Sequence, residues 1–106
     1  MISELEVSEA LTFLSSTDES AAKAKSYFMG LGEQCKTIHA IEFLKHEGPI
    51  EERKSQAYAS WDYRQHLVKL EQANLDYETL RNKRLTAELK IEVWRSENAN
   101  RRRGNI

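Results

Sequence analysis

The side chains best suited to chemistry in this chain are the basic ones of its last third. They form two groups, Arg81, Lys83 and Arg84, and then Arg95, Arg101, Arg102 and Arg103. The second group is interleaved with Trp94, Asn98 and Asn100. Arginine and asparagine contact phosphates and bases, and a run of arginines gains affinity for a polyanion by releasing its counterions. We therefore predict contact with a nucleic acid or an acidic partner through Arg81, Lys83, Arg95, Arg101, Arg102 and Arg103.

The distribution of charge supports a second interpretation of the same residues. The net charge is only -1, but residues 1–20 carry five acidic and no basic side chains, whereas residues 81–106 carry eight basic and three acidic ones. Arg81 and Arg84 are therefore also able to pair with Glu78, Glu88 or the acidic first segment of a neighbouring chain. An acidic protein or an anionic membrane is a further alternative.

No set of residues has the spacing of a catalytic or metal site. His39 and His46 are seven residues apart, two helical turns, which is too far to share a small metal ion. Cys35 is the only cysteine, and Gly30-Leu31-Gly32 lacks the Lys-Ser/Thr that completes a phosphate-binding loop. We expect a protein that is not an enzyme and that uses no metal and no cofactor.

The composition predicts an all-α fold, since good helix formers dominate and there are only four glycines and one proline. Ser3 with Glu6, and Ser16 with Glu19, have the spacing of capping boxes that open helices. Gly48-Pro49 has the pattern of a helix end followed by a helix start. We predict a single domain with helices over residues 3–14, 17–46 and 50–100, and a basic tail over 101–106 of the kind that is disordered. Whether the second helix breaks at Gly30–Gly32 stays open.

The last predicted helix carries one heptad seam, a line of residues spaced alternately by three and four. Its members are Ala59, Tyr63, His66, Leu70, Ala73, Tyr77, Leu80, Arg84, Ala87, Ile91, Trp94 and Asn98. A similar line runs through Ala21, Ala24, Phe28, Leu31, Cys35 and Ile38. The short link at Gly48-Pro49 then predicts an antiparallel, coiled-coil-like helical hairpin, with His66 as a packing residue.

The unequal lengths of the two predicted helices leave apolar residues to be covered. The shorter helix ends opposite about Leu80, and exposing the apolar residues beyond that point is costly. The first helix, a second subunit or both can cover them, and we predict a homo-oligomer. The predicted interface comprises Leu80, Arg84, Leu85, Ala87, Leu89, Ile91 and Trp94.

The N-terminal residues and the hydropathy profile give a prediction of location. Met1–Ala10 is acidic and has no apolar core, unlike a secretory signal. No apolar run approaches the roughly 20 residues that span a bilayer. We expect a cytoplasmic protein without a membrane partner.

About half of the chain carries a pattern of helix-forming residues at Gly48–Ser60, Tyr63, Leu80-Arg81, Ala87–Ser96 and Asn98–Arg101, of which the WRSxNANRR run is the most distinctive. In these residues the chain resembles small helical proteins encoded by tailed bacteriophages, of the kind found in lambda-like early regions. The resemblance implies an accessory protein in the cytoplasm of an infected host cell, acting on DNA or on a DNA-processing partner. It implies no catalytic residue.

Together these patterns predict a non-enzymatic, oligomeric helical protein that contacts nucleic acid, and the resemblance implies an accessory role in phage replication or recombination. The alternative is an adaptor or regulator that binds a phage or host protein, with Tyr58 or Trp61 as anchors, or an assembly chaperone for virion parts.

Overall fold

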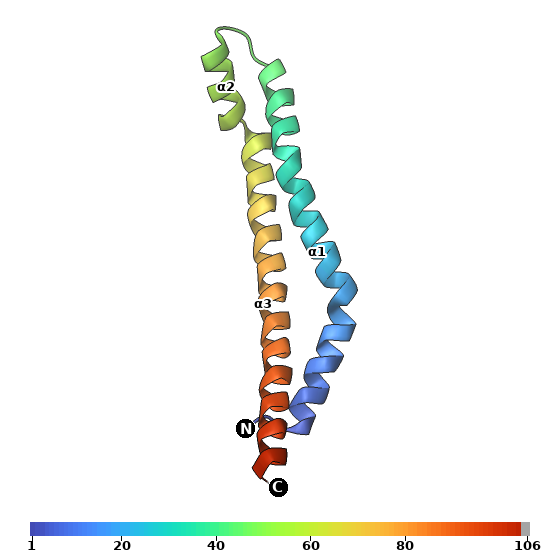
Figure 1. The fold of residues 1–106 in the computed structure, drawn as a ribbon. Coiled ribbons are helices and arrows are strands. Elements are labelled where there is room, and N and C mark those ends of the chain that lie inside the picture. The colour runs from blue at the N-terminus through green and yellow to red at the C-terminus, as the bar shows by residue number, and fades with distance from the viewer. Residues whose placement is uncertain (105–106) are drawn as a thin grey trace. The chain divides into compact units, whose positions relative to one another are not determined.

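The computed structural model describes residues 1–104 and confirms the all-α prediction. It contains three helices, α1 (Glu4–Leu44), α2 (Ile50–Ala59) and α3 (Trp61–Gly104), and no strand occurs within the described residues (Figure 1). These helices contribute to two compact units. The terminal unit combines Met1–Ala22 with the chain from Glu78 onward, and the hairpin unit is Lys23–Tyr77.

Helix α1 begins with the predicted capping box. The backbone N–H of Ser3 donates to Glu6 Oε2 at 2.8 Å, and the N–H of Glu6 donates to Ser3 Oγ at 3.1 Å. Each side chain therefore satisfies one amide that the helix start leaves without a carbonyl partner. The Ser3 backbone amide lowers the pKa of Glu6, and Lys90 lowers it further, against a partial desolvation that raises it.

The predicted break at Ser15–Thr17 is wrong, because α1 continues through it to Leu44. The hydroxyls of this segment donate back to carbonyls one turn earlier. Ser15 Oγ donates to Thr12 O at 3.1 Å, and Thr17 Oγ1 donates to Phe13 O at 2.7 Å. Such bonds keep hydroxyl side chains inside a helix instead of capping a new one. The helix also passes through Gly30–Gly32 without interruption.

The turn between α1 and α2 follows the predicted Gly-Pro pattern. Gly48 has a φ of 114°, which favours glycine, and Pro49 precedes the first residue of α2. Glu51 and Glu52 occupy the first turn, where the helix dipole favours acidic residues.

The single helix predicted over residues 50–100 is interrupted at Ser60, which has an extended backbone (φ -63°, ψ 149°). The Ser60 hydroxyl donates to Ala57 O at 2.7 Å and accepts the N–H of Tyr63 at 3.2 Å. Ser60 thus ends α2 and caps α3. The buried face of α2 therefore differs from the predicted one. Ala57 is fully buried, whereas Ala59, the predicted seam residue, is exposed.

From Tyr63 onward every predicted seam residue of α3 is buried or half-buried. In the hairpin unit they pack against α1 in antiparallel order. The rings of Tyr77 and Phe28 stack at 5.7 Å, and His39 meets Tyr63 edge-on at 5.9 Å. His66 is buried as predicted, with Nε2 2.6 Å from the carbonyl oxygen of Leu31.

The basic tail predicted from residue 101 onward is helical as far as the structure describes it, because Arg101, Arg102 and Arg103 form the last turn of α3. Basic residues at a helix C-terminus interact favourably with the helix dipole, which gives a physical reason for this extension. Residues 105 and 106 lie outside the described residues.

Candidate functional site

The last turn of α3 carries the most concentrated positive charge of the described chain. Arg101, Arg102 and Arg103 are all exposed. Among residues 1–104, no carboxylate lies within ion-pair distance of any of them. Three consecutive arginines project over a wide arc of the helix, so this turn presents cationic donors in several directions.

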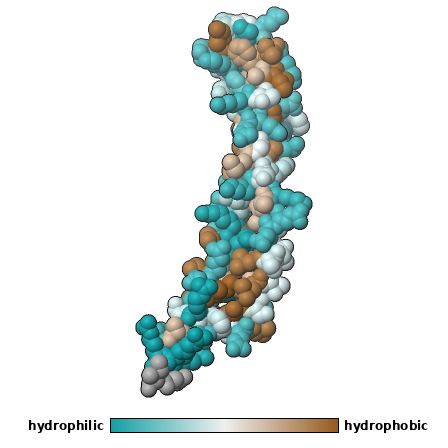
Figure 2. Space-filling view, turned by 45° about the vertical axis from the view of Figure 1, so that its right-hand side comes forward, coloured by the Kyte–Doolittle hydropathy of each residue, from teal (hydrophilic) through white to brown (hydrophobic). Residues whose placement is uncertain are grey.

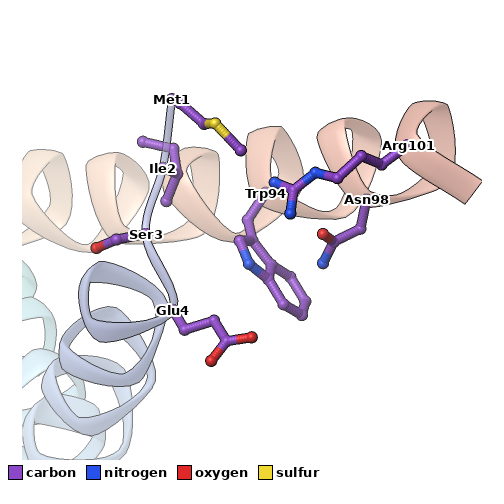
Figure 3. Close-up of a pocket in the computed structure, with 7 residues that line it drawn as sticks. All are labelled: Met1, Ile2, Ser3, Glu4, Trp94, Asn98 and Arg101. Carbon is purple, nitrogen blue, oxygen red and sulfur yellow. The ribbon is translucent and has the colours of Figure 1, made fainter.

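An open hollow of the terminal unit adjoins this basic turn. It is lined on the α3 side by Trp94, Asn98 and Arg101. The three residues lie on successive turns of one face of α3, opposite the first four residues of the chain (Figure 3). The hollow has a volume of about 390 Å³ and is lined by these three residues and by Met1, Ile2, Ser3 and Glu4. It combines a large aromatic face, an amide and a guanidinium.

The N-terminal wall of this hollow is held by hydrogen bonds. The N–H of Ile2 donates to Glu97 Oε2 on α3 at 3.1 Å. The capping box at Ser3 holds the next residue to α1. These two anchors fix both the start of α1 and the segment that precedes it, so the hollow is part of the folded structure of this unit.

Arg81 and Arg95, predicted as contact residues, take part in exposed ion pairs on α3 itself. Arg81 Nη1 lies 3.5 Å from Glu78 Oε2, and Arg95 Nη1 lies 3.1 Å from Glu92 Oε1. Such solvent-exposed pairs contribute about 0–1 kcal/mol, so a phosphate competes with them easily. Both arginines stay available to an anionic partner.

Lys83 lies at a different place from the basic turn. It lines a shallow hollow of about 210 Å³ together with Lys90 and the acidic residues Glu6 and Glu9 of α1. The nearby carboxylates reduce the positive potential there. Lys83 is therefore a weaker candidate for contact with a polyanion than the arginines of the last turn.

Arg84 is used within the chain. Its guanidinium donates to Leu14 O at 2.8 Å, to Thr17 Oγ1 at 2.6 Å and to Asp18 Oδ1 at 2.7 Å. The acidic first segment thus pairs with the basic end inside one molecule at this point, whereas the sequence suggested a neighbouring chain as one source of the acid.

The seven residues predicted for an oligomer interface fall into two groups. Leu80, Arg84, Ala87, Ile91 and Trp94 are buried or half-buried within the chain. Leu85 and Leu89 are exposed, as is Val93, which follows them at the same spacing. Figure 2 shows a hydrophobic patch on the terminal unit. The exposed large apolar residues of this unit are Met1, Leu5, Leu11, Leu85, Leu89 and Val93.

The side chains considered for metal binding do not converge. Within the described part of the chain, no three histidine, cysteine or acidic side chains gather closely enough to hold a metal ion. His39 packs on Tyr58 with ring centroids 4.1 Å apart, and Cys35 is half-buried beside Leu31 O.

Sequence reasoning found the arginines of the site but missed Ile2, Glu4 and Glu97. The only signal was the capping box at Ser3, which leaves the two preceding residues outside the helix and free to contact another element. The N-terminal wall depends on a hydrogen bond between residues 95 positions apart, and no local pattern encodes that contact.

None of the helices described over residues 1–104 has the length and apolarity needed to cross a bilayer. A comparison with protein-family models, curated proteins and solved structures finds no match to this chain.

Proposed function

We propose that this chain is a non-enzymatic helical accessory protein that binds single-stranded nucleic acid at the C-terminal end of α3. The observation that carries the proposal is the continuity between the exposed Arg101–Arg103 turn and the hollow formed by Trp94, Asn98 and Arg101. One surface of one helix thereby presents groups for phosphates and a face for a base.

The chemistry favours a single strand over a duplex. Proteins that bind single strands combine a cationic path for the backbone with aromatic side chains on which unpaired bases stack. In a duplex the bases are already stacked on one another, so an indole in a hollow gains no comparable contact. Arg101 and Asn98 line the same hollow as Trp94, which supports a contact of the guanidinium with a phosphate and of the amide donor and acceptor with a base stacked on the indole.

The direct test measures fluorescence anisotropy of labelled single- and double-stranded DNA at low and near-physiological salt. We expect the full chain to bind the single strand more tightly, with an affinity that falls steeply as salt increases. A chain ending at Asn100 and the variant R101Q/R102Q/R103Q should both lose this binding.

The matched control removes three positive charges elsewhere. The variant K54Q/R64Q/K69Q has the same net charge as the arginine variant but changes the hairpin unit only. It should bind almost as the unmodified chain does. An equal loss in both variants would show that net charge governs binding, and an absence of binding at low salt would refute the proposal.

We also propose that the chain self-associates, because Leu85, Leu89 and Val93 are 42%, 63% and 46% exposed at i, i+4 and i+8 of α3. Apolar side chains in a continuous line mark a surface that another protein covers. Sedimentation velocity over a range of concentrations tests this. The variant L85Q/L89Q should shift the distribution towards monomer if this line is the interface.

The alternative function is that of a protein adaptor or an assembly chaperone without nucleic-acid binding. It is favoured by the exposure of Tyr58 and Trp61, which are 54% and 66% exposed. A cytoplasmic role in phage replication or recombination is proposed from the resemblance to bacteriophage proteins alone, and affinity capture from infected cells tests it.

A further inference from the structure

The hairpin unit has an apolar groove that the basic site does not involve. Its volume is about 540 Å³, and it is lined by Phe28, Met29, Gly32, Glu33, Lys36 and Leu70. Met29 is 51% exposed. Four of the six lining residues follow one face of α1, at positions 29, 32, 33 and 36. The groove is therefore a single helix face with one leucine of α3 beside it.

Gly32 at the centre of this groove is not required by packing within the chain. A Cβ added there would meet only Leu70 Cδ1, at 4.0 Å, which is an ordinary van der Waals contact. Its backbone is helical, so it needs no left-handed conformation. Glycine inside a helix is destabilising relative to alanine and is used where another backbone approaches closely. Within residues 1–104, only the Leu70 side chain comes within 4 Å of a Cβ at this position and no neighbouring backbone does, so the position fits an approach from outside.

The charged residues that line the groove indicate which kind of partner binds there. Glu33 and Lys36 are exposed, carry opposite charges three residues apart, and have no ion-pair partner among residues 1–104. In a two-fold symmetric contact, each residue pair occurs twice with the partners exchanged. An antiparallel crossing centred between positions 32 and 35 brings Glu33 of each copy within about one helical turn of Lys36 of the other. The charges of this surface are therefore complementary to those of a second copy of it.

We propose that a second copy of this chain docks in this groove, antiparallel to the first, with the α1 backbones approaching closely at Gly32. The two Glu33–Lys36 pairs set the direction of the crossing, and Phe28, Met29 and Leu70 provide the apolar contact. This inference rests on the proposed self-association and adds to it a second contact, in the hairpin unit, that is separate from the line of Leu85, Leu89 and Val93.

The first test is a charge-exchange series in the full chain, with the dimer dissociation constant measured by sedimentation equilibrium. Glu33→Lys alone and Lys36→Glu alone each place like charges opposite one another twice. We expect each to weaken the dimer about tenfold or more. The double variant E33K/K36E restores opposite charges and should recover most of the affinity. Weakening in both single variants with no recovery in the double variant would overturn the antiparallel arrangement.

The second test uses the two helical glycines as a matched pair. Gly30 does not line the groove, and a Cβ added to it would meet nothing within 4 Å. Gly30→Ala and Gly32→Ala should both raise the midpoint of thermal unfolding at dilute, monomeric concentration. Only Gly32→Ala should weaken the dimer, and Gly32→Leu should abolish it. Equal effects of the two alanine variants on the dimer would overturn the close approach at Gly32.

These measurements separate the location of the contact from self-association itself. An unmodified chain that stays monomeric at every concentration refutes both the proposed self-association and this inference, and leaves the groove to a different protein. A chain that dimerises, but whose dimer is weakened by L85Q/L89Q and is unaffected by the Gly32 and Glu33 variants, refutes this inference and retains self-association.

Discussion

The Nη2 atom of Arg84 on α3 lies 2.7 Å from Oδ1 of Asp18 on α1, within the terminal unit. The same guanidinium donates to the carbonyl of Leu14 and to the hydroxyl of Thr17. Arg84 occupies a seam whose other positions are mostly apolar or aromatic. Because its donors need partners at defined places, this one residue specifies how the two helix segments are aligned.

Replacing Arg84 with alanine should therefore reduce the stability of the terminal unit. The Arg84 side chain is only 20% exposed, whereas that of Asp18 is 70% exposed. Most of the loss should thus come from the carbonyl of Leu14 and the Thr17 hydroxyl, which lose a charged donor. We expect the free energy of unfolding in urea to fall by about 2 kcal/mol.

Arg81→Ala is the matched control, because it removes an arginine one turn earlier whose pair with Glu78 is long and exposed. Its effect should stay within about 0.5 kcal/mol. Equal effects of the two substitutions would show that Arg84 acts through charge alone and has no role in alignment.

Ser60→Ala should destabilise the hairpin unit by about 1 kcal/mol, since it removes the side-chain acceptor at the start of α3. It also removes the hydroxyl that donates to Ala57 O where α2 ends. Ser55→Ala, an exposed change inside α2, should be neutral or slightly stabilising because alanine is the better helix former. Urea unfolding measures both. An unchanged stability for Ser60→Ala would mean that the burial of Ala57 maintains the interruption and that the Ser60 cap does not.

The contrast between Ser16 and Ser60 shows what the sequence can predict here. Ser16 with Glu19 matches a local capping pattern, yet α1 continues through it, with half-buried residues, Leu14 and Ala21, on both sides of the segment. Ser60 is not part of a capping box, yet the helix is interrupted there and Ala57 is fully buried. The three-four spacing predicted the buried face of α3 because side-chain burial follows helix periodicity.

The candidate site was predictable to a similar extent. The arginines were evident from composition, whereas the hollow depends on Ile2 meeting Glu97. Tertiary contacts decide both the interruption at Ser60 and the wall of the hollow, and a local pattern contains neither.

The capping box predicts how stability changes in acid. The Ser3 amide lowers the pKa of Glu6 below its ordinary value of 4.5, so the folded chain binds a proton there less readily than the unfolded chain. This contribution is present above pH 4.5 and is lost as the pH falls through the lowered value. Glu6→Gln keeps a capping side chain but does not titrate.

Urea unfolding of both proteins from neutral pH to about pH 3 checks this prediction, since the carboxyl group titrates in that interval. The difference in stability between the unmodified chain and Glu6→Gln should change in favour of the variant as the pH falls below 4.5. A difference that is constant with pH would show that the carboxylate of Glu6 gains nothing from the Ser3 amide.

The indole of Trp94 should report directly on nucleic acid in the hollow. The chain has two tryptophans, Trp61 in the hairpin unit and Trp94 in the terminal unit. In the variant Trp61→Phe, Trp94 is the only indole, and stacking of a base on it should quench its fluorescence when a single-stranded oligonucleotide is added. Adding Arg101→Gln to this variant should require more oligonucleotide for the same quenching. The reciprocal variant, Trp94→Phe, leaves only Trp61 and should show no change. If Trp61 is quenched as strongly as Trp94, or if anisotropy detects binding while Trp94 emission stays constant, then the polyanion contacts the arginines without placing a base in the hollow.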